Sequence, residues 1–179
     1  MVQVLDDKLT AQGILPGKTV AVASPRAEFI IPLALVASWR GWTVVFSGNS
    51  PQPLVEAGVD YDWLILTEAV AEGPAGRTIR VEPDWFRSPV DTLADLAAHA
   101  GAGAQFAFPS SGTTGTAKFT LSSEANRLEA MSDNWQFIEG GLSGRRGFTS
   151  LAPGTGWAFT TNFAFMLAGS SVVSLGLDT

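Results

Sequence analysis

Residues 19–47, TVAVASPRAEFIIPLALVASWRGWTVVFS, decide the fold class of this chain. The β-branched run Thr19–Ala23 predicts a buried strand, and Thr43–Ser47 predicts a second one. A helix-like stretch separates the two runs, and Gly41 is placed to end it just before the second strand. Two strands joined through a helix by short links run parallel. The stretch therefore predicts a parallel βαβ unit.

The helix between these strands is expected to follow Ser24-Pro25, which offer an N-cap and a proline at the first helical position. It continues to about Arg40. Its apolar face comprises Phe29, Ile30, Leu33 and Ala37. Because Pro32 lies inside the run and lacks an N–H, we expect a kink or a late start of the helix there.

The rest of the chain continues the alternation of strands and helices. Further strands are expected at Trp63–Thr67, Thr78–Val81 and Gln105–Phe108, with helices near Leu54, over Val90–His99 and from Ser122. The last of these helices is predicted by the spacing of Leu128, Met131, Trp135 and Ile138, and Gly140-Gly141 ends it. The pattern predicts one α/β domain over residues 1–179, with a mostly parallel sheet flanked by helices.

Composition excludes several classes of function. With 46% hydrophobic and 16% charged residues, the chain is expected to be globular and not disordered. A net charge of −6 would repel a phosphate backbone, so no nucleic-acid partner is expected. The absence of cysteine excludes disulfides, thiolate nucleophiles and zinc sites with sulfur ligands. The one histidine, His99, is interpreted as a helix C-terminal residue and not as a general base, and no metal ligands are assigned.

The two ends of the chain differ in character. The start, Met1–Asp7, has no basic and apolar secretory signal, so a cytoplasmic protein is expected. From Gly147 to Leu177 there is no charged residue, but prolines and glycines interrupt the segment and no membrane span is predicted. We expect a buried strand at Phe148–Leu151, a helix near Phe159–Leu167 and a buried strand at Ser171–Ser174. Something must cover so apolar a segment, and the chain ends soon after it, as though cut.

The stretch that carries chemistry is Ser110-Ser-Gly-Thr-Thr-Gly-Thr-Ala-Lys118, directly after an expected strand. Glycines let successive N–H groups turn toward one point, hydroxyls add hydrogen-bond donors, and Lys118 adds a compact positive charge. These groups together are suited to a polyphosphate. The lysine stands three residues after Gly115 and precedes Phe119, so this is not a Walker A loop. By composition alone, a surface loop rich in Ser, Thr and Gly remains an alternative.

This loop resembles the phosphate-binding signature of the adenylate-forming (AMP-binding) superfamily, which includes acyl-CoA and aryl-CoA synthetases, luciferases and nonribosomal adenylation domains. The family pattern is close to [ST]-S-G-[ST]-T-G-x-P-K, and the difference here is Ala117 in place of proline. The stretch Gly13-Ile-Leu-Pro-Gly-Lys-Thr-Val-Ala-Val22 is similar to an early family segment. The residues around Leu151–Pro153 and Phe165–Val173 follow the family's order of elements. The resemblance covers most of the chain and only the N-terminal part of the family's catalytic unit.

The sequence also departs from the family. Ser122-Ser123 stands where a serine-histidine pair is common, and Gly156 stands three residues after Pro153, where a histidine is common. Trp157 is expected in the core, with a role in shaping a pocket as the alternative. The family's later Tyr-Gly-x-Thr-Glu and Thr-Gly-Asp segments are absent, and no lysine follows Lys118. The chain thus resembles a fragment, or a naturally short relative, of such an enzyme.

The resemblance implies a ligase that uses ATP to convert a small carboxylic acid into an acyl-adenylate, with Mg²⁺ expected and coenzyme A as a possible acceptor. It assigns catalytic roles to Lys118 and Thr114. The phosphate-binding residues that it implies are Ser110, Ser111, Gly112, Thr113, Thr114, Gly115, Thr116 and Lys118. Two alternatives stay open: a non-catalytic module that binds a nucleotide or a partner, by self-association or with a missing C-terminal portion, and a Rossmann-like domain that binds the phosphate of another ligand.

Overall fold

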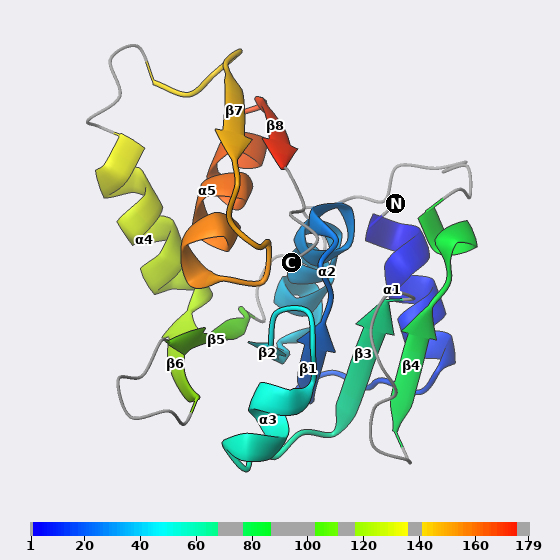
Figure 1. Ribbon diagram of the computed structural model, residues 1–179. Coiled ribbons are helices and arrows are strands. Elements are labelled where there is room, and N and C mark those ends of the chain that lie inside the picture. The colour runs from blue at the N-terminus through cyan, green and yellow to red at the C-terminus, as the bar shows by residue number, and fades with distance from the viewer. Residues whose placement is uncertain (1, 68–76, 87–102, 111–116, 136–140, 175–179) are drawn as a thin grey trace.

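The computed structural model describes residues 2–67, 77–86, 103–110, 117–135 and 141–174, and Figure 1 shows their arrangement. A six-stranded sheet forms the centre, with the order β4-β3-β1-β2-β5-β6. Its strands are β1 (Thr19–Ala23), β2 (Thr43–Phe46), β3 (Trp63–Thr67), β4 (Thr78–Val81), β5 (Gln105–Ser110) and β6 (Lys118–Ser123). All neighbours pair in parallel except β5 and β6, which are antiparallel. The predicted mostly parallel α/β fold is confirmed.

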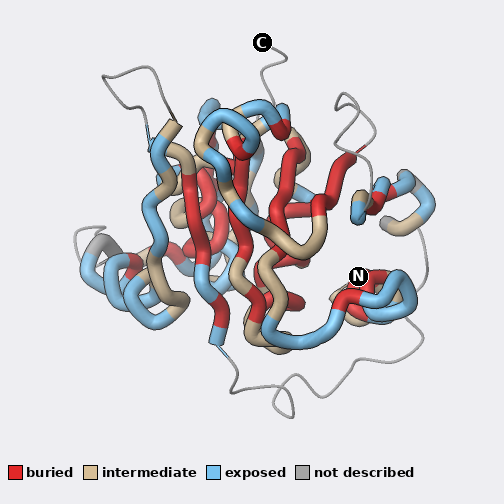
Figure 2. The backbone as a smooth tube through the Cα atoms, turned by 90° about the horizontal axis from the view of Figure 1, so that it is seen from below, coloured by how far each residue is buried: buried red, intermediate tan, exposed pale blue. Residues whose placement is uncertain are grey.

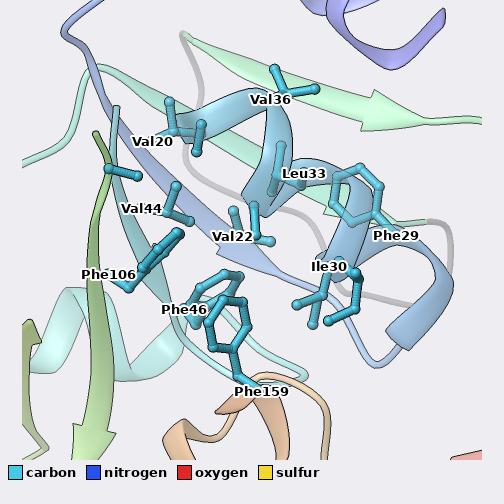
Figure 3. Close-up of a cluster of buried hydrophobic side chains, with 14 of the residues drawn as sticks. Val20, Val22, Phe29, Ile30, Leu33, Val36, Val44, Phe46, Phe106 and Phe159 are labelled. Carbon is cyan, nitrogen blue, oxygen red and sulfur yellow. The ribbon is translucent and has the colours of Figure 1, made fainter. Parts of the chain in front are cut away.

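Helices cover both faces of the sheet. The helices are α1 (Val2–Ala11), α2 (Ala27–Arg40), α3 (Gln52–Glu56), α4 (Glu124–Trp135) and α5 (Gly156–Leu167), with a 3-10 helix η1 at Pro83–Phe86. Large side chains of β1, β2 and β5 meet α2 and α5 on one face, where Phe46, Phe106 and Phe159 lie together (Figure 3). Small side chains such as Ala21 and Ala107 face the other way, toward Leu54 of α3. The buried strands therefore lie between helical layers (Figure 2).

Helix α2 differs from the prediction at its start. It begins at Ala27, with Arg26 as the N-cap, so Pro25 is not its first helical residue. The Ser24 hydroxyl accepts a hydrogen bond from the Arg26 N–H at 3.1 Å instead of capping the helix. Pro32 lies inside the continuous helix, so the prediction that the helix starts late, at the proline, is wrong. Because Pro32 has no N–H, the helix lacks one backbone hydrogen bond there. Gly41 ends the helix in a left-handed conformation with φ 65°, as expected.

Strand β6 and the start of α4 also differ from the prediction. Ser122 and Ser123 belong to β6, and the helix begins at Glu124. The Glu124 carboxylate accepts hydrogen bonds from the Ser38 hydroxyl at 2.8 Å and from the Ala104 N–H at 3.0 Å. These contacts anchor the first turn of α4 to α2 and to the residue before β5, which a helical periodicity does not reveal. The predicted helix at Val90–His99, with His99, lies outside the described residues.

The uncharged segment forms a second, two-stranded sheet from β7 (Arg146–Thr149) and β8 (Ser171–Ser174), which pair in parallel. The prediction that these strands are buried is wrong. Phe148 is 65% exposed and Val173 is 52% exposed, because one face of this small sheet has no layer over it in the described part of the chain. Helix α5 packs against the other face, and it begins three residues before the expected Phe159. Within the described ranges, no helix has the length and apolarity needed to cross a membrane.

Candidate functional site

The two ends of the predicted phosphate-binding loop lie opposite each other on β5 and β6. Ser110 pairs with Lys118 in the antiparallel register, and the Ser110 hydroxyl donates a hydrogen bond to the Lys118 carbonyl oxygen at 3.0 Å. The chain between them therefore leaves and re-enters the sheet at one point. The predicted residues Ser111, Gly112, Thr113, Thr114, Gly115 and Thr116 lie outside the described residues.

Strand alternation decides which face of the sheet Ser110 and Lys118 occupy. Phe106 and Phe108 lie on the face of the sheet that α5 covers. Because side chains alternate along a strand, Ser110, two residues after Phe108, lies on the same face. On β6, Phe119 packs with the small-residue cluster of the opposite face, so Lys118 lies on the α5 face. Lys118 is exposed and forms no ion pair with any described residue. An exposed, unpaired ammonium beside the loop fits an anion.

The first turn of α5 lies on the same face of the sheet, against Phe108 of β5. Thr155 is its N-cap, and the Thr155 hydroxyl accepts a hydrogen bond from the Ala158 N–H at 3.4 Å. A Cβ at Gly156 would lie 3.4 Å from Cγ of Phe108, and a Cβ at Gly154 would lie 3.3 Å from Cα of Gly48. The chain at Gly154 therefore approaches the end of β2 more closely than most side chains allow. Where the family commonly has a histidine, this chain has Gly156 packed on Phe108.

Arg127 adds a second cation that the sequence analysis did not single out. Nη1 donates a hydrogen bond to the Thr160 hydroxyl at 3.2 Å, and Cζ lies 4.6 Å from the Phe108 ring centroid. Burial lowers the pKa of the Arg127 guanidinium, and no described carboxylate forms an ion pair with it. Arg127 thus brings positive charge to the ring two residues before Ser110. The sequence signal that could have pointed to Arg127 is its place next to Leu128 and four residues before Met131, on the apolar side of the predicted helix.

Hydroxyl side chains end three of the parallel strands at their carboxyl edge. Ser24, Ser47 and Thr67 directly follow or complete β1, β2 and β3, and all three are buried. The Thr67 hydroxyl donates to the Ser24 hydroxyl at 3.2 Å, and the Ser47 hydroxyl donates to the Val22 carbonyl oxygen at 3.2 Å. These groups bond to one another and to the backbone, so they stabilise the edge beside the site and do not extend toward a ligand.

Trp157 does not have its expected place. Its side chain is 67% exposed at the second position of α5, so the expectation that it belongs to the core is wrong. The buried residues of α5 include Ala158, Phe159 and Phe163, and Trp157 lies outside that buried stripe.

Among the described residues, no group of three His, Asp or Glu side chains is arranged to hold a metal ion. The assembled candidate site consists of Ser110, Lys118, Arg127 and the start of α5.

Comparisons with known proteins identify the architecture. No family model matches the sequence, and no curated protein matches it. Among solved structures, the N-terminal domain of FACL13 from Mycobacterium tuberculosis matches 99% of this chain with a TM-score of 0.74 and 20% identity. A Mycobacterium tuberculosis fatty acyl CoA synthetase matches 99% of this chain with a TM-score of 0.76 and 18% identity. The match covers 49% of the FACL13 domain and 38% of the fatty acyl CoA synthetase.

A third similar structure is o-succinylbenzoate coenzyme A synthetase from Bacillus subtilis in complex with ATP and magnesium ion. It matches 99% of this chain with a TM-score of 0.70 and 16% identity, and 49% of that protein is covered. This chain spans about half the length, or less, of the solved structures that it matches. The resemblance noted in the sequence is confirmed at the level of the fold: this chain has the fold of the N-terminal domain of the adenylate-forming enzymes.

Proposed function

We propose that this chain is the N-terminal part of an AMP-forming ligase that activates a carboxylic acid with ATP and passes the acyl group to a thiol such as that of coenzyme A. The observation that carries the proposal is the pairing of Ser110 with Lys118, the two ends of the hydroxyl-rich stretch, on the face where Arg127 and the start of α5 lie. The likeness to coenzyme A synthetases supports the class of reaction. Fold alone does not assign it.

In this proposal the loop binds the β- and γ-phosphates of ATP. Thr113 and Thr114 donate through their hydroxyls, and Gly112 and Gly115 allow backbone N–H groups to point at the same oxygens. Ser111 and Thr116 add supporting donors, while Ser110 holds the loop closed. Mg²⁺ bound with ATP would neutralise further phosphate charge.

The proposed reaction has two displacement steps. A carboxylate oxygen of the acid attacks the α-phosphorus of ATP, the bond from that phosphorus to the bridging oxygen breaks, and pyrophosphate leaves. Lys118 stabilises the negative charge that gathers on the pyrophosphate, and positioning of the phosphates does the rest. The thiolate sulfur then attacks the acyl carbon, and AMP leaves as the thioester forms.

The test is the double variant Lys118→Ala with Thr114→Ala. In the full ligase, ATP–pyrophosphate exchange is expected to fall by more than about tenfold, which corresponds to more than about 1.4 kcal/mol of transition-state stabilisation. Lys8→Ala is the matched control, because Lys8 pairs with Asp84 beside α1 and has no place in the proposed site. Unchanged exchange in the double variant would remove Lys118 and Thr114 from the roles assigned here.

A second function is supported by a different observation. Phe148 and Val173 are register partners in the small sheet, and both side chains are more than half exposed. Exposed apolar clusters mark association sites in many proteins. The alternative is therefore a non-catalytic module that self-associates or binds a partner through this surface. Acyl-adenylate formation by the isolated chain would contradict this alternative. Light scattering, which measures the size of the species in solution, tests the association.

A further inference from the structure

A pocket of about 470 Å³ lies between the first turns of α2 and the second half of α5. It is lined by Ala27, Glu28, Ile31, Pro32, Asn162, Met166, Ser170 and Val172. The two helices contact each other, and β8 contacts α5, so the walls belong to packed elements. The volume falls in the range of about 300 to 1,000 Å³ that is usual for small-molecule sites.

Asn162 is the unusual feature of this pocket. It is only 4% exposed, and neither its amide nitrogen nor its amide oxygen has a hydrogen-bond partner among the described residues. Leaving such a buried group without a partner is destabilising, and buried polar groups are normally hydrogen-bonded. The neighbouring buried residues of α5, Phe159 and Phe163, are apolar. The wall of the pocket therefore includes a buried amide whose hydrogen-bonding groups are not used by the described residues.

The Asn162 side chain carries both kinds of hydrogen-bonding group on this wall. Its amide nitrogen is a donor and its amide oxygen is an acceptor.

The charges of the lining determine which groups suit the pocket. No lysine or arginine is among the described residues that line the pocket. Glu28 is exposed, and its carboxylate pairs with Arg26 at 3.4 Å. An anionic group inside the pocket would therefore find no cation among these lining residues. The remaining walls, Ile31, Pro32, Met166 and Val172, are apolar. The chemistry favours an uncharged, largely apolar molecule that carries a carboxamide or hydroxyl group.

We infer that this pocket binds the uncharged body of a small molecule through paired hydrogen bonds between its carboxamide or hydroxyl group and Asn162. Asn162 lies six residues after Gly156, which is about 9 Å along the helix axis from the turn that packs on Phe108 beside the loop. An acid bound with its body in the pocket would keep its carboxylate outside. That the molecule is the acid activated by the ligase rests on the proposed function; the binding itself does not.

The experiment is a titration of the chain, without ATP, with two probes of similar shape. Benzamide both donates and accepts hydrogen bonds, whereas acetophenone, with a methyl group in place of the amide nitrogen, only accepts. Benzamide is expected to bind about tenfold more tightly and to shift the Asn162 side-chain amide signal in nitrogen-proton NMR spectra. Benzoate, which is charged, is expected to bind more weakly than benzamide.

Asn162→Leu removes both hydrogen-bonding atoms and keeps the volume. It is expected to abolish the preference for benzamide over acetophenone while raising the thermal stability of the chain, since the unsatisfied amide is gone. Asn126→Leu is the matched control, because Asn126 is exposed on α4 and does not line the pocket. The control should keep the wild-type preference.

Two results would overturn the inference: an Asn162 amide signal that benzamide does not move, or equal affinities of the wild-type chain for benzamide and acetophenone. Both readouts use the wild-type chain, so they hold even if Asn162→Leu does not fold. Failure of the proposed function is recognised separately, because Lys118→Ala would then leave ATP binding unchanged while benzamide still binds.

Discussion

Asp62 makes three contacts at the amino end of the sheet. Its carboxylate accepts a hydrogen bond from the Thr19 N–H at 3.0 Å and one from Lys18 Nζ at 3.1 Å, and Arg77 Nη1 lies 3.7 Å away. The bond from the Thr19 N–H, followed by the bond from Lys18, lowers the pKa of Asp62. One side chain thus joins the start of β1 to the residue before β3.

At the residue scale, we predict that Asp62→Asn reduces stability near neutral pH and that its effect fades in acid. The lowered pKa means that the carboxylate stabilises the folded chain fully above the ordinary aspartate pKa of about 4, and less as pH falls below it toward the folded-state value. Urea unfolding midpoints of both proteins between pH 3 and pH 7 measure this. A difference that stays constant over that range would contradict the assignment.

Helix α1 is attached to α2 by an ion pair between Asp6 and Arg40. Nε and Nη2 of Arg40 donate to the two carboxylate oxygens at 2.7 and 2.6 Å, and Asp6 is only 3% exposed. Leu5 and Leu9 pack beside it in the main core. The docking of this element therefore depends on a buried carboxylate that is neutralised by the Arg40 guanidinium.

At the element scale, Arg40→Met is expected to destabilise the chain by roughly 3 kcal/mol, because removing one partner leaves the other charge buried. The double variant Asp6→Leu with Arg40→Met should recover most of the loss, since both charges are gone. Thermal unfolding of the two variants measures the difference. Equal destabilisation by the single and double variants would mean that packing of the Arg40 stem, and not the buried charge, determines the effect.

The whole molecule has an apolar surface on one side. Phe148 and Val173 are partners in the register of β7 and β8, and both are more than half exposed. A sheet of two strands is marginal in water and normally gains stability from further strands or another layer. Among the described residues, this sheet has no third strand and one of its faces is uncovered.

At the scale of the whole molecule, we predict that the chain scatters light as a species larger than its 18.8 kDa monomer. Replacing Phe148 and Val173 with serine should shift it toward the monomer. Leu15→Ser is the control, because Leu15 is 60% exposed and belongs to the connection between α1 and β1, not to the small sheet. A monomeric wild-type chain would contradict association through this surface.

Part of the candidate site followed from the sequence. Ser110 and Lys118 were identified by local residue types, since a loop that binds phosphate needs glycines, hydroxyls and a cation close together in the chain. Arg127 was missed because its closeness to Phe108 depends on how α4 packs on α5. Asn162 was missed for a similar reason: an unpartnered amide is recognised only when its surroundings are known.

The sequence by itself determined the order of elements and the parallel sheet, because hydrophobic periodicity and glycine or proline boundaries act over a few residues. Tertiary structure alone decided the antiparallel edge strand β6, the exposure of Phe148 and Trp157, and the pocket beside Asn162. Each of these depends on which surfaces meet across long separations in the chain. Burial is a property of the packed layers and not of the apolar character of a segment.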